Sequence, residues 1–259
     1  MEQMAKMPVL FVGHGSPMNA IEDNNYTRSW KEIAERIGKP KVILALSAHW
    51  YTKGSRINNE EFPKTIYDMY GFPKELYEII YDAPGSPGTA QTAMDLISAA
   101  TNYDNSWGLD HGTWSVLHHM YPDRDVPVFQ ISIDGSAPPE SHYRIGRDLR
   151  SLREQGVLIF GSGNVVHNLR MVDWNKANRA YDWALEFDEY IYENIMNKDH
   201  GRILQFKDLG STARLAVPTP DHFYPLLYTL GATDETDQIS VYNKSGELGS
   251  LTMTSYLWE

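Results

Sequence analysis

Short apolar runs alternate with segments of helical periodicity along most of this chain. Four runs are nearly all apolar, as in strands that are covered on both faces of a sheet: residues 9–12, 41–47, 126–133 and 157–160. Apolar residues spaced three to four positions apart predict helices elsewhere: from about 30 to 37, and over 73–81, 88–100, 141–155 and 174–196. Pro127 suits either the first residues of a strand or an edge strand.

The C-terminal segment follows a different pattern. Residues 239–242 and 251–257 alternate like an antiparallel pair, with Gly246 and Gly249 in the turn between them. No internal repeat, low-complexity stretch or linker interrupts the chain. The order of elements therefore predicts a single α/β domain over residues 1–259, with a mostly parallel central sheet, helices on both faces and an antiparallel C-terminal edge.

The composition excludes several classes of function. With 259 residues and 42% apolar residues, the chain is long enough and apolar enough to bury a full core. A net charge of -11 and the lack of a basic run argue against binding nucleic acid through its phosphates. There are no cysteines, so disulfides, a thiolate nucleophile and iron–sulfur clusters are excluded, and any metal must be bound by nitrogen and oxygen.

Neither a membrane span nor an export signal is predicted. No apolar stretch approaches the ~18 residues that cross a bilayer, and residues 1–7 are polar with no apolar core behind them. We therefore expect a cytoplasmic protein that does not associate with membranes. The oligomeric state stays open.

Four of the nine histidines lie where the chain changes direction, each beside a glycine, a small residue or a proline: His14, His49, His167 and His222. The first three come at or after the ends of predicted buried strands. Open α/β sheets place their chemistry at the carboxyl ends of strands, and imidazole is the commonest metal-binding side chain. This placement predicts a metal site built from several histidines.

Each position also has a plainer interpretation. Gly13 and Gly15 can simply form a turn around His14, and Ser47 can cap a helix near His49 without a histidine. Residues 161–163, Gly-Ser-Gly, can cradle a phosphate, but the Gly-x-Gly-x-x-Gly spacing and a matching lysine are absent. His222 lies among prolines whose rigidity suits a ligand, although a surface histidine would also fit there.

The remaining histidines differ in their prospects. His111 precedes a glycine and can reach a pocket, whereas His118 and His119 point in different directions on a helix and are expected to be structural or exposed. His142 and His200 are predicted to face solvent. The chain has neither the His-Glu-x-x-His pattern of zinc proteases nor the Gly-x-Ser-x-Gly elbow of serine hydrolases.

Five motifs, in the same order along the chain, resemble those of the class III extradiol ring-cleavage dioxygenases, and most closely the 4,5-DOPA extradiol dioxygenase branch. The resemblance runs from residue 8 to nearly the C-terminus. The motifs are Gly13-His14-Gly15-Ser16-Pro17, Ser47-Ala48-His49-Trp50, Leu109-Asp110-His111-Gly112-Thr113-Trp114, Gly161-Ser162-Gly163-Asn164-Val165-Val166-His167-Asn168 and Thr219-Pro220-Asp221-His222-Phe223.

The resemblance implies roles for particular residues. His14, His49 and His222 correspond to metal ligands, and His167 to a catalytic acid/base that is also counted as a fourth ligand in some resting sites. His111 corresponds to a catalytic histidine that contacts the substrate or a ligand. Related enzymes use a glutamate as third ligand, whereas here His222 stands with Asp221 beside it.

The implied cofactor is Fe²⁺, which enables a catechol to react with O₂; Zn²⁺ can occupy the same site, since the affinity of nitrogen sites rises from Fe²⁺ towards Zn²⁺. The implied substrates are O₂ and a catechol such as DOPA or another 3,4-dihydroxyphenyl compound, and ring opening beside the two hydroxyls gives a semialdehyde. His167 suits proton transfer because the ordinary histidine pKa of about 6.5 lies near working pH.

Two other functions remain open. A zinc-dependent hydrolase or amidase would use the same histidines to hold a metal-bound water. A non-catalytic protein could use the pocket to bind a small aromatic molecule, although the four histidines would then have no role.

Overall fold

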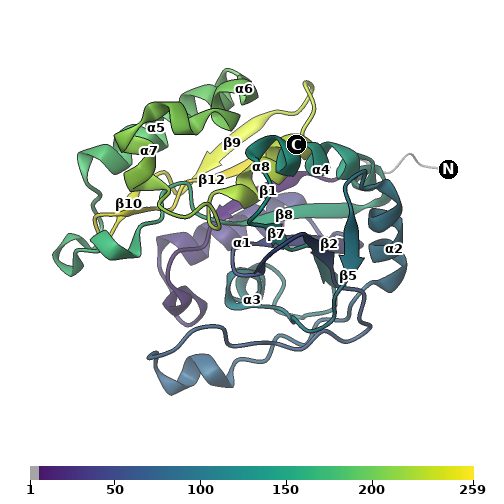
Figure 1. Cartoon of the computed structure of the whole chain (residues 1–259). Coiled ribbons are helices and arrows are strands. Elements are labelled where there is room, and N and C mark those ends of the chain that lie inside the picture. Colours follow the sequence, from purple (N-terminus) through teal and green to yellow (C-terminus); the bar gives the residue numbers. More distant parts are fainter. Residues whose placement is uncertain (1–5) are drawn as a thin grey trace.

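The computed structural model describes residues 6–259 and is built around a six-stranded mixed sheet in the order β6-β2-β8-β1-β12-β9 (Figure 1). Its four parallel strands come first in that order: β6 (Val128–Gln130), β2 (Val42–Ser47), β8 (Val157–Gly163) and β1 (Val9–Gly13). β12 (Ser255–Trp258) runs antiparallel to β1 and pairs with β9 (Ile239–Tyr242) at the edge. The predicted fold class is thus confirmed, antiparallel C-terminal edge included.

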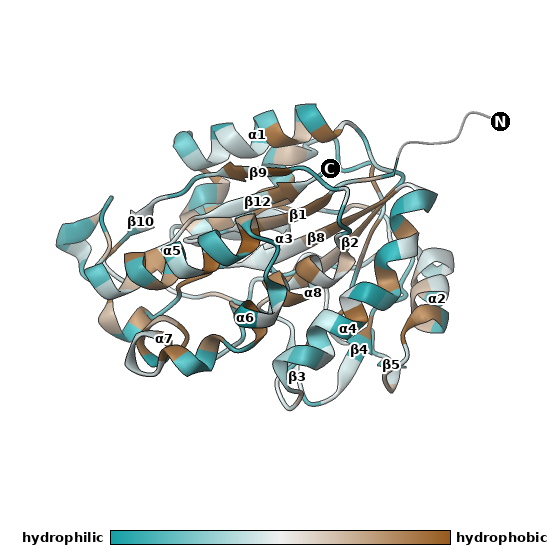
Figure 2. Ribbon diagram, turned by 90° about the horizontal axis from the view of Figure 1, so that it is seen from above, coloured by the Kyte–Doolittle hydropathy of each residue, from teal (hydrophilic) through white to brown (hydrophobic). Residues whose placement is uncertain are grey.

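Helices cover both faces of this sheet, because its strands are apolar on both sides. Val9 and Phe11 of β1 face one core, and Leu10 and Val12 face the other. The first core is covered chiefly by α4 (Pro139–Leu149), α5 (Asp182–Met196) and α8 (Tyr224–Ala232), with α2 (Pro87–Leu96) beside them. The second core is covered by α1 (Asn25–Ile37) and α3 (His111–Met120). Figure 2 shows the apolar central strands between α1 on one side and α4 and α8 on the other.

Smaller elements complete the structure. Three two-stranded pairs flank the main sheet: β3 (Tyr51–Thr52) with β7 (Ile133–Asp134), β4 (Ser55–Ile57) with β5 (Thr101–Tyr103), and β10 (Gly246–Glu247) with β11 (Leu251–Thr252). Two short helices, α6 (His200–Leu204) and α7 (Ser211–Ala216), pack near α5. None of the helices over residues 6–259 combines the length and apolar character that crossing a bilayer requires.

Several predicted bounds are wrong, two of them because residues far apart in the sequence pair with one another. The helix predicted over 174–196 begins only at Asp182, because the backbone of 179–181 pairs with Gly249 instead. The strand predicted over 126–133 divides, since Ser132 and Ile133 bond to Arg56 and Trp50 rather than to β2.

Other predicted bounds also differ from the structure. The helix predicted over 73–81 is reduced to one 3₁₀ turn, Lys74–Glu78, within a long irregular segment, and the one predicted over 88–100 ends at Leu96. The helix over 141–155 begins at Pro139 and becomes 3₁₀ from Arg150. The run over 251–257 divides into β11 and β12, which pair with different partners. The edge position that Pro127 suggested is confirmed, because it directly precedes the edge strand β6.

Candidate metal centre

The carboxyl ends of three adjacent parallel strands bring the predicted histidines together. His14 follows β1, His49 follows β2, and His167 follows β8, which lies between them in the sheet. Backbone hydrogen bonds secure these ends: the His14 N–H donates to the Gly163 carbonyl at 3.0 Å, and the Asn164 N–H to the His222 carbonyl at 2.9 Å. His222 thereby joins the site from the segment that precedes α8.

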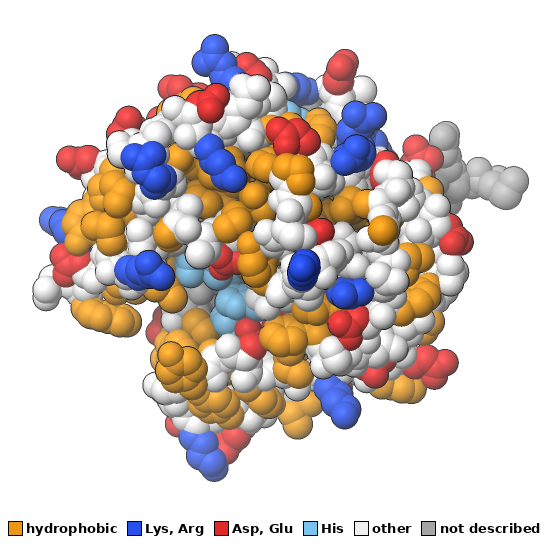
Figure 3. All heavy atoms as spheres, viewed as in Figure 1, with side chains coloured by type: hydrophobic (Ala, Val, Ile, Leu, Met, Phe, Trp, Pro, Cys, Tyr) orange, Lys and Arg blue, Asp and Glu red, His pale blue; other side chains and the backbone are white. Residues whose placement is uncertain are grey.

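Five imidazole rings gather at this edge. The ring centroids of His14, His49 and His222 form a nearly equilateral triangle, with sides of 5.1, 5.3 and 5.0 Å. The other two lie against members of the triangle: His111 is 3.8 Å from His49, and His167 is stacked parallel on His222 at 3.4 Å. Figure 3 shows pale blue histidine side chains at the bottom of a hollow, with hydrophobic side chains around it. The structure therefore brings all five predicted site residues into one cluster.

His14 is held by a hydroxyl that determines which of its nitrogens carries the proton. Ser162 Oγ donates its only hydrogen to the Gly112 carbonyl at 2.5 Å, so it must accept from His14 Nδ1, 2.9 Å away. The proton of His14 is therefore on Nδ1, and its Nε2 presents a lone pair.

A carboxylate oxygen also lies beside Nδ1 of each of the other two rings of the triangle. Asp221 Oδ2 accepts from His222 Nδ1 at 2.5 Å, and Asp68 Oδ2 lies 3.2 Å from His49 Nδ1. Burial alone would raise the pKa of Asp68, but the hydrogen bond from His111 and the nearby imidazoles lower it below its ordinary value, so the carboxyl is ionised. A carboxylate beside Nδ1 favours a proton there, and this leaves Nε2 free to bind a metal.

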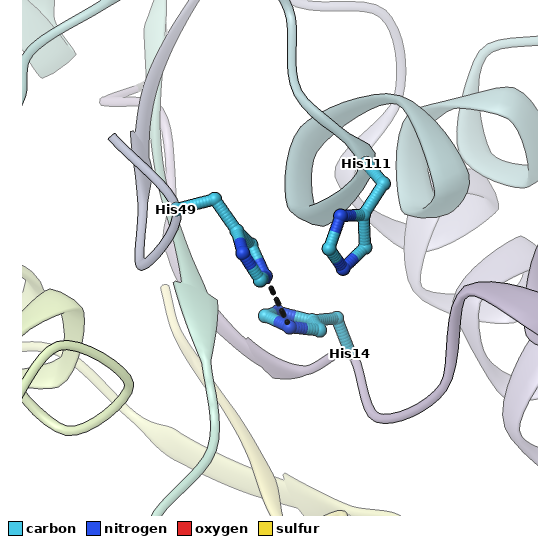
Figure 4. A group of neighbouring side chains, drawn as sticks. All are labelled: His14, His49 and His111. Carbon is cyan, nitrogen blue, oxygen red and sulfur yellow. Dashed lines mark hydrogen bonds between the residues drawn. The ribbon is translucent and has the colours of Figure 1, made fainter. Parts of the chain in front are cut away.

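The geometry fits a bound cation. The Nε2 atoms of His14 and His49 face one another at 3.2 Å (Figure 4). Burial lowers the pKa of His14 well below its ordinary value and that of His49 to about 3, and neighbouring imidazoles add to both shifts. Two neutral rings thus direct lone pairs at each other, an arrangement that a cation between them stabilises. Two nitrogens each about 2.1 Å from a tetrahedral metal are about 3.4 Å apart, close to the distance found.

Other groupings of donor atoms are also close. One ligand atom each from His14, His49 and His111 lie within 4.8 Å of one another, and so do ligand atoms of His167, Asp221 and His222. All of these donors are nitrogen or oxygen, which excludes the soft thiolate sites that Cu(I) and iron–sulfur clusters prefer. The cluster can hold a divalent cation while leaving further imidazoles beside it.

His167 keeps a more open position than the rings of the triangle. It is half-buried, and its backbone N–H donates to the Ala216 carbonyl at 3.0 Å. Burial lowers the pKa of His167 to about 4, with Asp221 favouring protonation and His111 opposing it. The ring is therefore neutral at pH 7 and able to accept a proton.

The four histidines outside the cluster are partly as predicted. The prediction that His142 faces solvent is wrong: it is fully buried, 4.2 Å from the ring of Tyr224, because α8 packs across the face of α4 that the sequence pattern suggests is polar. His200 is also not solvent-facing, since it is half-buried and bonded to the Tyr143 hydroxyl at 3.0 Å. His118 and His119 are half-buried, and His119 has the structural role expected, bonded to the Asn19 carbonyl.

Asp68 and Ser162 contact the site histidines, but the sequence pattern did not identify either of them as a site residue. Ser162 lies inside the motif of residues 161–168, but no feature of the neighbouring sequence identifies it as the hydrogen-bond partner of His14. Asp68 stands between Tyr67 and Met69 in an irregular segment, and its only signal is one acidic residue in an otherwise apolar and aromatic stretch.

Comparisons with known proteins identify the family of the chain. Residues 7–255 match the family model described as the catalytic LigB subunit of aromatic ring-opening dioxygenase. The chain is 45% identical to a 4,5-DOPA dioxygenase extradiol of Escherichia coli (strain K12), covering 96% of this chain and 94% of that protein. It is 36% identical to a protein of the same name from Beta vulgaris, covering 95% and 94%.

A solved structure shows the same fold. The crystal structure of an uncharacterized protein from Escherichia coli K12 superposes with a TM-score of 0.85 and 41% identity, covering 97% of this chain and 99% of that one. Together with the family match over almost the whole chain, this similarity leaves one conclusion. The chain belongs to the LigB family of catalytic subunits of aromatic ring-opening dioxygenases.

Proposed function

We propose that this protein is an iron(II)-dependent extradiol dioxygenase that opens the ring of a catechol, with DOPA or a related 3,4-dihydroxyphenyl compound as substrate. The family and the names of the relatives support the reaction class. The observation that carries the proposal is the triangle of His14, His49 and His222. Each Nδ1 in it has an acceptor from the protein beside it, so each Nε2 remains for a metal.

The spacing of the rings supports these three histidines as the ligands. Two imidazoles on one metal, each with its nitrogen about 2.1 Å from the ion, have centroids about 4.5 to 5.3 Å apart. The sides of the triangle fall within this range. The His49–His111 and His167–His222 pairs are closer, at 3.8 and 3.4 Å, so His111 and His167 pack against ligands instead of sharing the ion with them.

This assignment leaves His167 as the acid/base. Its neutral ring accepts a proton from a catechol hydroxyl and later returns one as the ring opens. The stack on His222 holds it beside the metal position, and its half-buried edge meets the entering substrate. His111, whose Nδ1 donates to Asp68 at 2.9 Å, presents Nε2 as an acceptor for a substrate hydroxyl.

The overall reaction needs no external reductant. When bound, iron(II) supplies the redox chemistry through which a spin-paired catechol reacts with triplet O₂. The carbon–carbon bond beside one hydroxyl-bearing carbon breaks. One atom of O₂ ends in the new carboxyl group and the other in the new aldehyde, so the product is a hydroxylated semialdehyde. The residues of the chain bind and orient the catechol and move its protons.

Metal reconstitution tests the proposal. Protein stripped with a chelator is loaded with Fe²⁺ or Zn²⁺ without oxygen, then mixed with DOPA and a panel of other catechols in air. Iron-loaded protein should produce a yellow semialdehyde and consume one O₂ per catechol at an oxygen electrode. Zinc-loaded protein should bind metal without turnover, because Zn²⁺ has no redox chemistry.

Variants test the ligands. His14→Ala and His49→Ala should reduce metal content to nearly zero, whereas His200→Gln, which changes a histidine outside the cluster, should keep both metal and turnover. Unchanged metal content in either alanine variant would contradict the ligand set. If iron-loaded protein opens no catechol while zinc-loaded protein hydrolyses an ester or amide, the protein is a zinc hydrolase instead.

A further inference from the structure

One carboxylate, that of Asp68, lies between two histidines of the site. Its Oδ2 is 2.9 Å from His111 Nδ1 and 3.2 Å from His49 Nδ1, while its Oδ1 accepts from the backbone N–H of His111 at 2.8 Å. The side chain is 9% exposed, so little water competes for these contacts. We infer that Asp68 is a positioning residue, which sets the tautomer and orientation of His49 and His111 together.

The segment that carries Asp68 is attached firmly to the start of α3. The Ile66 N–H donates to the Leu109 carbonyl and the Leu109 N–H to the Lys64 carbonyl, both at 2.8 Å. The indole N–H of Trp114, on α3, donates to the Ile66 carbonyl at 2.9 Å. The carboxylate is therefore held on a fixed frame, although its segment has almost no regular secondary structure.

The chemistry follows from what a carboxylate can accept. An ionised carboxylate has no hydrogen to donate, so both nitrogens facing it are favoured as N–H groups. Each ring then carries its lone pair on Nε2. For His49 that atom faces His14 Nε2, and for His111 it is the acceptor available to a substrate hydroxyl. Because one oxygen serves both rings, Asp68 links the metal ligand to the substrate contact.

Asp68→Asn replaces one acceptor oxygen by an NH₂ group of nearly the same shape. If that group faces Nδ1 of either ring, the ring must offer a lone pair there and carry its proton on Nε2. His49 in that tautomer cannot bind a metal through Nε2. Changes in such outer partners of metal ligands typically weaken metal binding by about 10- to 100-fold.

The test reads tautomers directly. Long-range ¹H–¹⁵N NMR spectra distinguish Nδ1–H from Nε2–H imidazoles, and single His→Gln variants assign the signals. In metal-free and zinc-loaded wild type, His49 and His111 should both be Nδ1–H. In Asp68→Asn, at least one of them should change to Nε2–H. Zinc affinity, measured by competition with a chromophoric chelator, should fall about 10- to 100-fold.

Glu75→Gln is the matched control, because Glu75 is an exposed carboxylate on the same long segment; it should keep the wild-type tautomers and zinc affinity. An Asp68→Asn protein with both tautomers unchanged and zinc affinity within about twofold of wild type would overturn the inference. So would an Nε2–H signal for His49 or His111 in wild type, a result that needs no variant to fold.

The inference rests on the proposed function, since it treats His49 as a metal ligand, but the two fail in different ways. If wild type binds no zinc, or binds it equally well after His49→Ala, the proposed metal site is wrong. The tautomers of the metal-free protein still report whether Asp68 positions the two rings.

Discussion

Gly163 lies at the point where the backbones that carry two of the proposed ligands meet. Its carbonyl accepts from the His14 N–H at 3.0 Å, and a Cβ added to it would lie only 2.1 Å from the carbonyl oxygen of His222. Real Cβ contacts closer than 3.0 Å essentially do not occur, so Gly163→Ala must separate these groups by at least about 0.9 Å. The obstacle is backbone, which cannot rotate away as a side chain can.

Two effects of Gly163→Ala should be measurable. Overpacking of this kind costs about 1–3 kcal/mol, and each kcal/mol lowers Tm by about 2–4 °C for a chain of this size. Displacing His222 by about 1 Å should also lower iron-dependent turnover of the catechol by about 10²-fold, the effect of a comparable misplacement in other enzymes. Thermal unfolding, zinc competition and the oxygen-electrode assay measure these quantities on one preparation.

Gly88→Ala is the control for this substitution. Gly88 lies in α2 with no neighbouring atom within 4 Å of an added Cβ, so alanine should be neutral or stabilise by about 0.5–1 kcal/mol. If Gly163→Ala unfolds at the wild-type temperature and binds zinc with wild-type affinity, the backbone of residues 161–163 is not the support that positions His222.

Two further predictions concern a proton-transfer group and a buried carboxyl. His167→Gln should retain zinc and bind catechol but lose about 10²- to 10⁴-fold in turnover, the usual contribution of a positioned acid/base; loss of zinc binding would instead make His167 an obligatory ligand. Burial raises the pKa of Asp188 to about 6, so the folded state keeps a proton that the unfolded chain loses near pH 4. The stability of wild type relative to Asp188→Asn should therefore fall by about 3 kcal/mol as pH rises from about 4 to above 6. Urea unfolding of both proteins at pH 4 and 7 measures it, and a difference between them that does not change with pH would contradict the assignment.

The sequence predicts the centre of the sheet better than its surroundings. The apolar runs at 9–12 and 41–47 closely match β1 and β2, because a strand covered on both faces must be apolar throughout. The run at 126–133 looks the same in sequence but divides, since only its first part lies next to β2. The apolar pattern shows that a strand is buried but not which strand it pairs with. It therefore does not reveal where a strand separates from its neighbour in the sheet.

The sequence mispredicts helix ends for a related reason. Residues 174–181 suit a helix by composition, yet the backbone of residues 179 and 181 bonds to Gly249, far away in sequence. His142 shows the same limit on a helix face. The polar residues of α4 suggest a solvent-facing side, but α8 packs closely against α4 and buries the ring between Tyr224 and Tyr228.

Strand topology brings His14, His49 and His167 to one edge of the sheet, so these three could be proposed from the sequence pattern, whereas His222 and His111 come from the segments that begin α8 and α3. What makes them able to bind a metal is a different property, the position of each ring proton. That property depends on Ser162 for His14 and on Asp68 for His49, partners that are distant in sequence and come from separate segments. Only His222 has its partner, Asp221, next to it in the chain, where a motif could include it. A histidine at a strand end is thus a candidate ligand, and the acceptor behind its Nδ1 determines whether its Nε2 can bind the ion.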